Sequence, residues 1–120
     1  MEVYRVVDYA SSAGKYPYRD WLSKLDEKIR ARIQLRILRF RMGNLGDYKI
    51  LGGGLFEARF SFGSGYRVYF GKVENKILLL LLGGDKRSQT RDIMKARLYW
   101  DHYLNNRKEY LCQEEAEIGK

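Results

Sequence analysis

Two alternating segments joined by a tight turn constrain the fold of this chain more than any other feature. They run from Leu55 to Phe62 and from Tyr66 to Val73, with Gly63-Ser64-Gly65 between them. The apolar side chains on one face are Phe56, Ala58, Phe60 and Phe62, followed by Tyr66, Val68 and Phe70. The other face carries Leu55, Glu57, Arg59 and Ser61, followed by Arg67 and Tyr69. A period of two predicts an antiparallel β-hairpin with one core face and one largely polar face.

Two further strands are predicted on either side of this hairpin. Ile77 to Leu82 is apolar at every position, which is typical of an interior strand covered on both faces, and we expect it at the centre of the sheet. Glu74-Asn75 supplies the turn that precedes it. Tyr4 to Asp8 alternates and predicts a first strand.

The remaining periodic segments predict helices. Pro17 stands near the start of the amphipathic stretch Tyr18 to Leu25, and Asp26 is a suitable N-cap for a second helix over Glu27 to Met42. A terminal helix follows the polar loop Gly83 to Ser88. Its apolar positions at helical spacing are Ile93, Ala96, Trp100, Tyr103 and Leu104. Between the second helix and the hairpin, five glycines over residues 43–54 predict a loop rather than a regular element.

The order of these elements predicts an α+β domain. An N-terminal strand and a helical hairpin precede a small antiparallel sheet, and a C-terminal helix packs with the others against that sheet. A chain of 120 residues is long enough for one such core. We expect a single domain over residues 1–108, followed by an acidic, frayed tail over residues 109–120.

The charge of the chain favours phosphate-rich partners. The formal net charge is +8, and the last twelve residues hold four glutamates and one lysine. They contribute about −3, so the predicted domain carries about +11. Lysine and arginine side chains that contact a nucleic-acid backbone release its condensed counterions, which favours binding.

Other classes of site and location are disfavoured by composition. One cysteine, Cys112, and one histidine, His102, provide neither a disulfide nor a Cys/His metal site. No segment has the roughly 20 apolar residues of a membrane-spanning helix, and the first residues lack signal-peptide character. We therefore expect a cytoplasmic protein that needs no metal or other cofactor and has no membrane partner.

The polar face of the hairpin contains the strongest candidate site. Arg59 and Arg67 are predicted on adjacent antiparallel strands with Glu57 and Tyr69 on the same side. Lys86 and Arg87 lie on the loop after the neighbouring strand, and Lys49 precedes the hairpin. Guanidinium groups match phosphate oxygens in bidentate contacts, so these cations suit an anionic ligand. The alternative is that Arg59 pairs with Glu57 or another carboxylate and the remaining cations are ordinary surface charges.

A second set of arginines lies on the predicted second helix. Arg32, Arg36 and Arg39 are spaced to form a stripe that either contacts RNA or is a solvated helix face, and we favour the solvated face. Among single residues, His102, Trp21 and Trp100 are expected to be structural, and Cys112 inert. The triple glycine at 52–54 lacks the context of a phosphate-binding loop, which favours a flexible loop beside the substrate.

Three motifs together resemble a known family. Lys49-Ile-Leu-Gly-Gly-Gly-Leu-Phe-Glu-Ala-Arg59 is followed by Gly65-Tyr-Arg-Val-Tyr-Phe70 and then by Leu82-Gly-Gly-Asp-Lys86, with Gln89 and Asp92-Ile93 beyond. These motifs resemble the HigB-type addiction-module killer proteins of the RelE/ParE superfamily. The resemblance covers about Tyr4 to Tyr103. It implies the compact RelE-like fold of microbial ribonucleases.

The resemblance also implies an activity. HigB-type toxins of type II toxin-antitoxin systems are messenger RNA endoribonucleases that act in the decoding site of the ribosome, without a metal ion, by activating a ribose 2′-hydroxyl. By this resemblance Arg67 stabilises the phosphate, Arg59 is a basic residue of the preceding strand, and Lys86 is the loop cation. The residues expected to bind RNA or the ribosome are Lys49, Glu57, Tyr69, Arg87 and Gln89.

The sequence departs from the family pattern at two positions. Glu57 stands where several ribosome-cutting relatives carry a lysine, and Ile93 and Met94 stand where some place a tyrosine. The nearest tyrosines for proton transfer are then Tyr69 and Tyr99. Between two arginines, Glu57 is expected to have a lowered pKa and to orient them rather than act as a base.

The resemblance implies partners and leaves two alternatives. The expected partners are the ribosome, messenger RNA and a cognate antitoxin, a HigA-like helix-turn-helix protein. The same superfamily contains ParE-like toxins that poison DNA gyrase without cutting RNA, and fold alone does not separate the two activities. The other alternative is an inactive module that only binds its antitoxin.

Overall fold

The computed structural model describes residues 3–118 of the chain, and the side chains of residues 3–107. Its elements in chain order are β1 (Arg5–Asp8), α1 (Pro17–Ser23), α2 (Glu27–Phe40), β2 (Tyr48–Gly52), β3 (Leu55–Arg59), β4 (Arg67–Val73), β5 (Ile77–Gly84), the 3-10 turn η1 (Lys86–Ser88) and α3 (Gln89–Ile118). The strands form one sheet in the order β1-β5-β4-β3-β2. This arrangement confirms the predicted α+β class.

The sheet is mixed rather than antiparallel. Strands β2 to β5 pair antiparallel, but β1 pairs parallel with β5, and α1 and α2 lie between β1 and β2 in the chain. The prediction of a purely antiparallel sheet is therefore wrong. Ile77–Gly84 is an interior strand, as predicted, but the central position belongs to β4, because β2 adds a strand on the far side of β3.

Strand β2 lies where the sequence predicted only loop. Gly53 and Gly54 form the turn, and both have positive φ. Tyr48–Gly52 is the strand before this turn and pairs with β3; it ends at Gly52, which also has positive φ. Helix α3 holds this turn, because the indole nitrogen of Trp100 donates to the carbonyl oxygen of Gly53 at 2.7 Å. Arg97 also donates to two carbonyl groups at the end of β2. The expected flexible loop is thus a β-turn fixed by α3.

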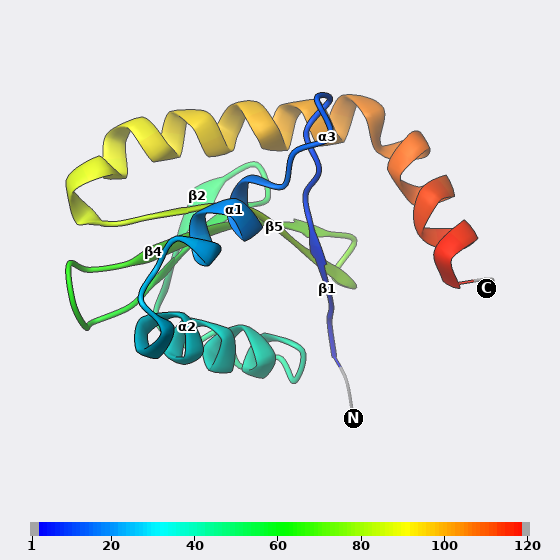
Figure 1. The fold of residues 1–120 in the computed structure, drawn as a ribbon. Helices are drawn as coiled ribbons and strands as arrows, with labels where there is room; N and C mark the ends of the chain where they lie inside the picture. The colour runs from blue at the N-terminus through cyan, green and yellow to red at the C-terminus, as the bar shows by residue number, and fades with distance from the viewer. Residues whose placement is uncertain (1–2, 119–120) are drawn as a thin grey trace.

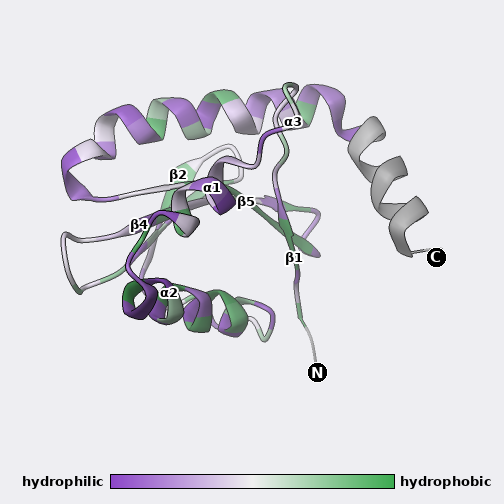
Figure 2. Ribbon diagram, in the orientation of Figure 1, coloured by the Kyte–Doolittle hydropathy of each residue, from purple (hydrophilic) through white to green (hydrophobic). Residues whose placement is uncertain are grey.

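Helices cover both faces of the sheet (Figure 1). On one face α1 and α2 bury a core that includes Ile33, Phe40, Phe60, Val68 and Phe70. On the other face α3 buries a second core that includes Leu55, Tyr69, Leu81, Ala96 and Trp100. Hydrophobic and hydrophilic residues are interspersed along α2 and along the coloured part of α3 (Figure 2), and the buried apolar residues of each helix pack in the core on its side of the sheet.

The face predicted to be polar is therefore mostly covered. Glu57 and Tyr69 are fully buried beneath α3, together with Leu55. The prediction of an open polar face is wrong at these positions, because the terminal helix packs across β4 and β5. Gly71 permits this close packing, since a Cβ atom there would overlap the ring of Trp100.

Helix α3 extends further than the predicted domain. Its backbone is helical to Ile118, with a non-helical residue at Asn106. Residues 109–118, which lie within the tail predicted over residues 109–120, belong to this helix by their backbone. Cys112 and the acidic side chains of the tail lie outside the described side chains. Among the described side chains, Nδ1 of His102 and the Tyr9 hydroxyl are joined by a hydrogen bond of 2.7 Å, which agrees with the expectation of a structural or surface histidine.

Candidate functional site

A buried carboxylate organises the candidate site. Arg59 and Arg67 lie directly opposite each other on β3 and β4, as the hairpin predicted. Nε of Arg59 donates to Oε1 of Glu57 at 3.0 Å, and Nε of Arg67 lies 3.9 Å from the same oxygen. Gln89, at the start of α3, donates to Oε2 at 2.9 Å. We call Glu57, Arg59, Arg67 and Gln89 the Glu57 cluster.

The two arginines of the cluster differ in exposure. The side chain of Arg59 is 36% exposed, whereas that of Arg67 is 13% exposed and Glu57 is completely covered. Nε of Arg67 is buried without a hydrogen-bond partner among the described residues, and its Nη1 donates to the carbonyl of Gly65 at 3.2 Å. Two guanidinium groups thus share one carboxylate, which leaves the cluster with a positive charge.

The environment keeps Glu57 ionised. Burial alone would raise the pKa of its carboxyl group, but the hydrogen bonds from Gln89 and Arg59 and the charges of Arg67 and Arg59 outweigh burial and lower the pKa. Both carboxylate oxygens are also occupied by donors. Glu57 is therefore placed to orient the arginines and not to accept a proton from a ligand.

The η1 turn brings Lys86 to the cluster. Asp85 caps this turn by accepting from the backbone N–H of Arg87 at 2.9 Å. The backbone N–H of Lys86 donates to the carbonyl of Ser64 at 3.4 Å, which ties η1 to the hairpin turn. A Cβ atom on Gly65 would lie 3.3 Å from Cβ of Lys86 and 3.7 Å from Nη1 of Arg67. The three predicted catalytic cations, Arg59, Arg67 and Lys86, therefore lie around one end of the β3–β4 hairpin.

The start of α3 completes this arrangement. The side chain of Asp92 is buried, and Ser88 donates to it. A Cβ atom on Gly84 would overlap the Asp92 carboxylate, so this glycine allows the first turn of α3 to approach the end of β5. This close approach places Gln89 within reach of Glu57.

Of the other predicted binding residues, Lys49 and Arg87 are exposed, whereas Glu57 and Tyr69 are buried. Lys49 is exposed on β2 directly opposite Glu57, so it shares the face of the cluster. Arg87 is turned to Asp85, with its Nη2 3.0 Å from Oδ2, and its side chain is 83% exposed. The hydrogen bond from Arg87 lowers the pKa of Asp85. Tyr69 is buried, so neither it nor Glu57 offers a surface for direct contact with RNA.

Neither candidate tyrosine is suited to proton transfer at the Glu57 cluster, because Tyr69 stays protonated and Tyr99 packs elsewhere. The hydroxyl group of Tyr69 is buried beside Glu57 but makes no well-formed hydrogen bond with the described residues. Burial, followed by the charges of Glu57 and Asp92, raises its pKa, so the phenol stays protonated. Tyr99 packs against Tyr9, with ring centroids 5.1 Å apart, and Tyr9 follows β1 at the other end of the strand order.

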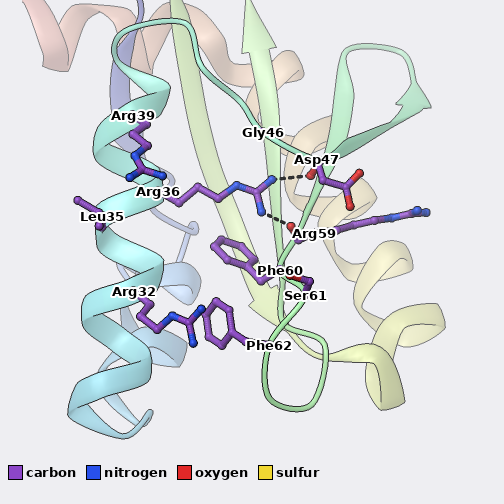
Figure 3. Close-up of a pocket in the computed structure, with 10 residues that line it drawn as sticks. All are labelled: Arg32, Leu35, Arg36, Arg39, Gly46, Asp47, Arg59, Phe60, Ser61 and Phe62. Carbon is purple, nitrogen blue, oxygen red and sulfur yellow. Dashed lines mark hydrogen bonds between the residues drawn. The ribbon is translucent and has the colours of Figure 1, made fainter.

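The arginine stripe on α2, formed by Arg32, Arg36 and Arg39, is only partly exposed to solvent. Arg36 is half-buried and donates to the backbone carbonyl oxygens of Arg59 and Asp47 (Figure 3). It also donates to the carbonyl oxygen of Leu45, so it joins α2 to β3 and to the preceding loop. Burial lowers the pKa of Arg36, and the charge of Asp47 opposes that shift. The prediction of a solvated face is wrong for Arg36, although Arg32 and Arg39 are exposed.

These arginines border a groove of about 470 Å³ between α2 and the end of β3. We call it the α2 groove. The residues that line it are Arg32, Leu35, Arg36, Arg39, Gly46, Asp47, Arg59, Phe60, Ser61 and Phe62. Arg59 connects the two sites, because its carbonyl group bonds to Arg36 while its side chain points away from α2 toward Glu57 (Figure 3).

The described part of the chain contains neither a candidate metal cluster nor a candidate membrane-spanning helix. Within the described residues, no three His, Cys, Asp or Glu side chains gather in a way that would hold a metal ion. None of the helices in that part of the chain combines the length and apolar character needed to cross a bilayer.

Comparison with known proteins places the chain beside one relative. No protein-family profile matches the sequence. An uncharacterized protein of Haemophilus influenzae (strain ATCC 51907 / DSM 11121 / KW20 / Rd) is 44% identical over 82 residues, which are 68% of this chain and 83% of that protein. The chain belongs to the family of that protein.

Sequence reasoning missed the role of Arg36 and the burial of Glu57. A signal for Glu57 was present, since a carboxylate two residues before Arg59 on one strand face has an obvious partner. Arg36 had no comparable signal, because the carbonyl groups it contacts come from a loop and from β3, which are distant in sequence.

Proposed function

We propose that this protein is the toxin of a type II toxin-antitoxin system, a messenger RNA endoribonuclease that acts on the ribosome and inhibits translation. The observation that supports this most strongly is the register of Arg59 opposite Arg67, with both guanidinium groups at Glu57 and Lys86 beside them. The HigB-like motifs converge on this place. We further infer that the α+β fold is a RelE-like variant.

The cluster suits phosphoryl chemistry because its cations are oriented before a ligand arrives. Glu57 holds Nε of Arg59 and faces Nε of Arg67, which leaves the outer Nη groups of Arg59 available to an anion. Lys86 is exposed beside Arg67 and adds a further charge. Preorganised donors aimed at developing negative charge contribute most to such a reaction, since they need no reorganisation.

The proposed reaction is a transesterification within the message. The ribose 2′-hydroxyl gives its proton to water and its oxygen attacks the adjacent phosphorus. The bond to the 5′-oxygen of the next nucleotide breaks, and that oxygen takes a proton from water, so the products are a 2′,3′-cyclic phosphate and a 5′-hydroxyl end. In this scheme Arg59, Arg67 and Lys86 stabilise the additional charge on the phosphoryl oxygens, and Glu57 is a positioning residue. Lys49, exposed on the same face, helps to dock the strand, whereas Arg87 is engaged by Asp85.

The proposed partners follow from this activity. They are the ribosome with its message, in the cytoplasm, and a cognate HigA-like helix-turn-helix antitoxin that covers the toxin. No cofactor is part of the proposal. An adjacent gene for a small helix-turn-helix protein that co-purifies with the chain is the expected genetic context.

Induced expression tests the proposal. We expect growth arrest within minutes, with new 5′ ends mapped inside translated codons, and relief when the neighbouring antitoxin is co-expressed. Double-strand breaks in DNA with an SOS response, and no new RNA ends, would instead indicate a ParE-like gyrase poison. Lys86→Ala is the informative variant because Lys86 is exposed and its loss leaves the Glu57 contacts in place.

One observation favours a second candidate, an inactive module that only binds its antitoxin. Glu57 partly neutralises Arg59 and Arg67, and it stands where several ribosome-cutting relatives have a cation. Harmless overexpression, together with tight antitoxin binding and no RNA cleavage, would support this alternative over the nuclease.

A further inference from the structure

We propose that the α2 groove binds the backbone and bases of single-stranded RNA, as a second contact surface beside the Glu57 cluster. This goes beyond the proposed nuclease activity, because it assigns a surface that the HigB-like motifs do not include. Only the identity of the strand as messenger RNA rests on the proposed function.

The charge of the groove favours an anionic ligand. The side chains of Arg32, Arg36 and Arg39 and one acidic residue, Asp47, line the groove, whereas Arg59 also borders it but turns its side chain away toward Glu57. Arg36 is committed to backbone carbonyl groups, so its charge stays in the wall of the groove. Arg32 and Arg39 are exposed and form no ion pair with the described residues. They stand seven residues apart on α2, or roughly 10 Å along the helix axis.

The aromatic rings favour RNA over an acidic peptide. The guanidinium group of Arg32 lies over the ring of Phe62, 3.8 Å from its centroid, and that of Arg36 lies over Phe60 at 4.4 Å. An exposed guanidinium plane backed by a ring offers its other face to a nucleobase. Carboxylates of a peptide need cations but no such planes. The cations in this groove are also all arginines, the residue suited to both stacking and phosphate contact.

The groove adjoins the candidate site through one residue. Arg59 lines the groove, and its side chain contacts Glu57. Ser61, also in the groove wall, is exposed two residues further along the chain. The groove and the Glu57 cluster therefore meet at Arg59, whose carbonyl group faces α2 and whose guanidinium group faces Glu57, so a strand held by Arg32 and Arg39 would contact the α2 side of this residue and not its guanidinium group.

The experiment uses the full chain and a fluorescent oligouridylate of about 12 nucleotides, with binding followed by anisotropy at several salt concentrations. The double variant Arg32→Ala/Arg39→Ala is compared with Lys15→Ala/Lys24→Ala, which removes the same charge from exposed positions outside the groove. We expect the groove variant to bind about tenfold more weakly and the control less than about twofold. The slope of log affinity against log salt should fall in magnitude by about 1.4 for the two lost phosphate contacts.

A conservative variant separates stacking from charge. Arg32→Lys keeps the charge but removes the plane over Phe62, so we expect weaker binding with an unchanged salt slope. Equal affinities of the two double variants would overturn the inference. Displacement of the RNA by an oligoglutamate peptide at lower concentration than by unlabelled RNA would also overturn it, in favour of a peptide-binding surface.

The failure of this inference and that of the nuclease are distinguishable. A chain that binds RNA through Arg32 and Arg39 but cuts no message would end the proposed function and leave the groove assignment standing. If the chain cuts messages but the two double variants bind RNA equally well, the groove assignment would be wrong and the proposed nuclease activity would stand.

Discussion

Two arginine environments lie on opposite faces of the same sheet, and they stabilise the positive charge in different ways. Arg67 and Arg59 face the carboxylate of Glu57 under α3, whereas the two Nη groups of Arg36 donate to backbone carbonyl groups between α2 and β3. A carboxylate cancels charge, while carbonyl dipoles stabilise a cation without cancelling it. The Glu57 cluster therefore depends on an ionisable partner, and the Arg36 contacts do not.

The largest expected effect comes from removing the shared carboxylate. Glu57→Gln leaves Arg59 and Arg67 opposite each other without a counter-charge, and breaking a buried pair in this way should lower the free energy of unfolding by about 3 kcal/mol. Urea unfolding at pH 7 measures this loss. The matched control Asp101→Asn removes an exposed carboxylate from α3 and should change the stability by less than about 0.5 kcal/mol. Equal effects of the two variants would contradict the role given to Glu57.

The next effect concerns the carbonyl-bound arginine. Arg36→Met keeps the apolar stem but leaves three carbonyl groups without their donor, which should cost about 2 kcal/mol in urea unfolding. Arg39→Met, three residues further along the same helix, changes an exposed side chain and should cost less than about 0.5 kcal/mol. If Arg36→Met is as mild as its control, the carbonyl contacts do not stabilise the join between α2 and β3.

Acid pH should lower the stability contributed by the Glu57 cluster but not the stability contributed by the Arg36 contacts. The pKa of Glu57 is lowered below its ordinary value of 4.5, so its ionised form stabilises the fold above that pH, and this contribution is lost as the pH falls through the lower folded-state pKa. The gap in stability between wild type and Glu57→Gln should stay constant from pH 7 to 5 and narrow below 4.5. The gap for Arg36→Met should not follow that acid transition. Urea unfolding across this range is the measurement, and parallel pH profiles would contradict the contrast.

The smallest effect is expected at Tyr69. Its hydroxyl group is buried beside Glu57 but forms no well-formed hydrogen bond with the described residues, so Tyr69→Phe should change stability by less than about 0.5 kcal/mol. Tyr9→Phe is the control, because that hydroxyl bonds to Nδ1 of His102 at 2.7 Å and its loss should cost about 1 kcal/mol. A large loss at Tyr69 would mean that its hydroxyl group stabilises the Glu57 cluster.

Local sequence patterns predicted most of the elements but not how they assemble. The hairpin register that sets Arg59 against Arg67 followed from alternation and the glycine turn, and the N-cap at Asp26 was also correct. Strand β2 escaped prediction because Gly52, Gly53 and Gly54 suggested a loop, whereas pairing with β3 and contacts to α3 stabilise the extended segment before them. The parallel pairing of β1 with β5 is equally non-local.

The candidate site was predictable in its members but not in its burial. Arg59, Arg67 and Lys86 meet near one hairpin end, and the pairing of Arg59 with Glu57 was one of the two interpretations left open by the sequence. The packing of α3 over the polar face decided the rest, since it buries Glu57 and Tyr69 and brings Gln89 to the carboxylate. No periodicity within the hairpin reports which helix will cover it.

The most direct test of the proposed nuclease site is cleavage of a defined message on purified ribosomes, followed by primer extension. Wild type, Arg67→Ala and Lys86→Ala are compared after their folding has been checked by thermal unfolding. We predict codon-phased cleavage by wild type and rates at least about 100-fold lower for each variant, because each removes a donor to the phosphoryl oxygens. Cleavage by both folded variants at the wild-type rate would contradict the assignment of this cluster.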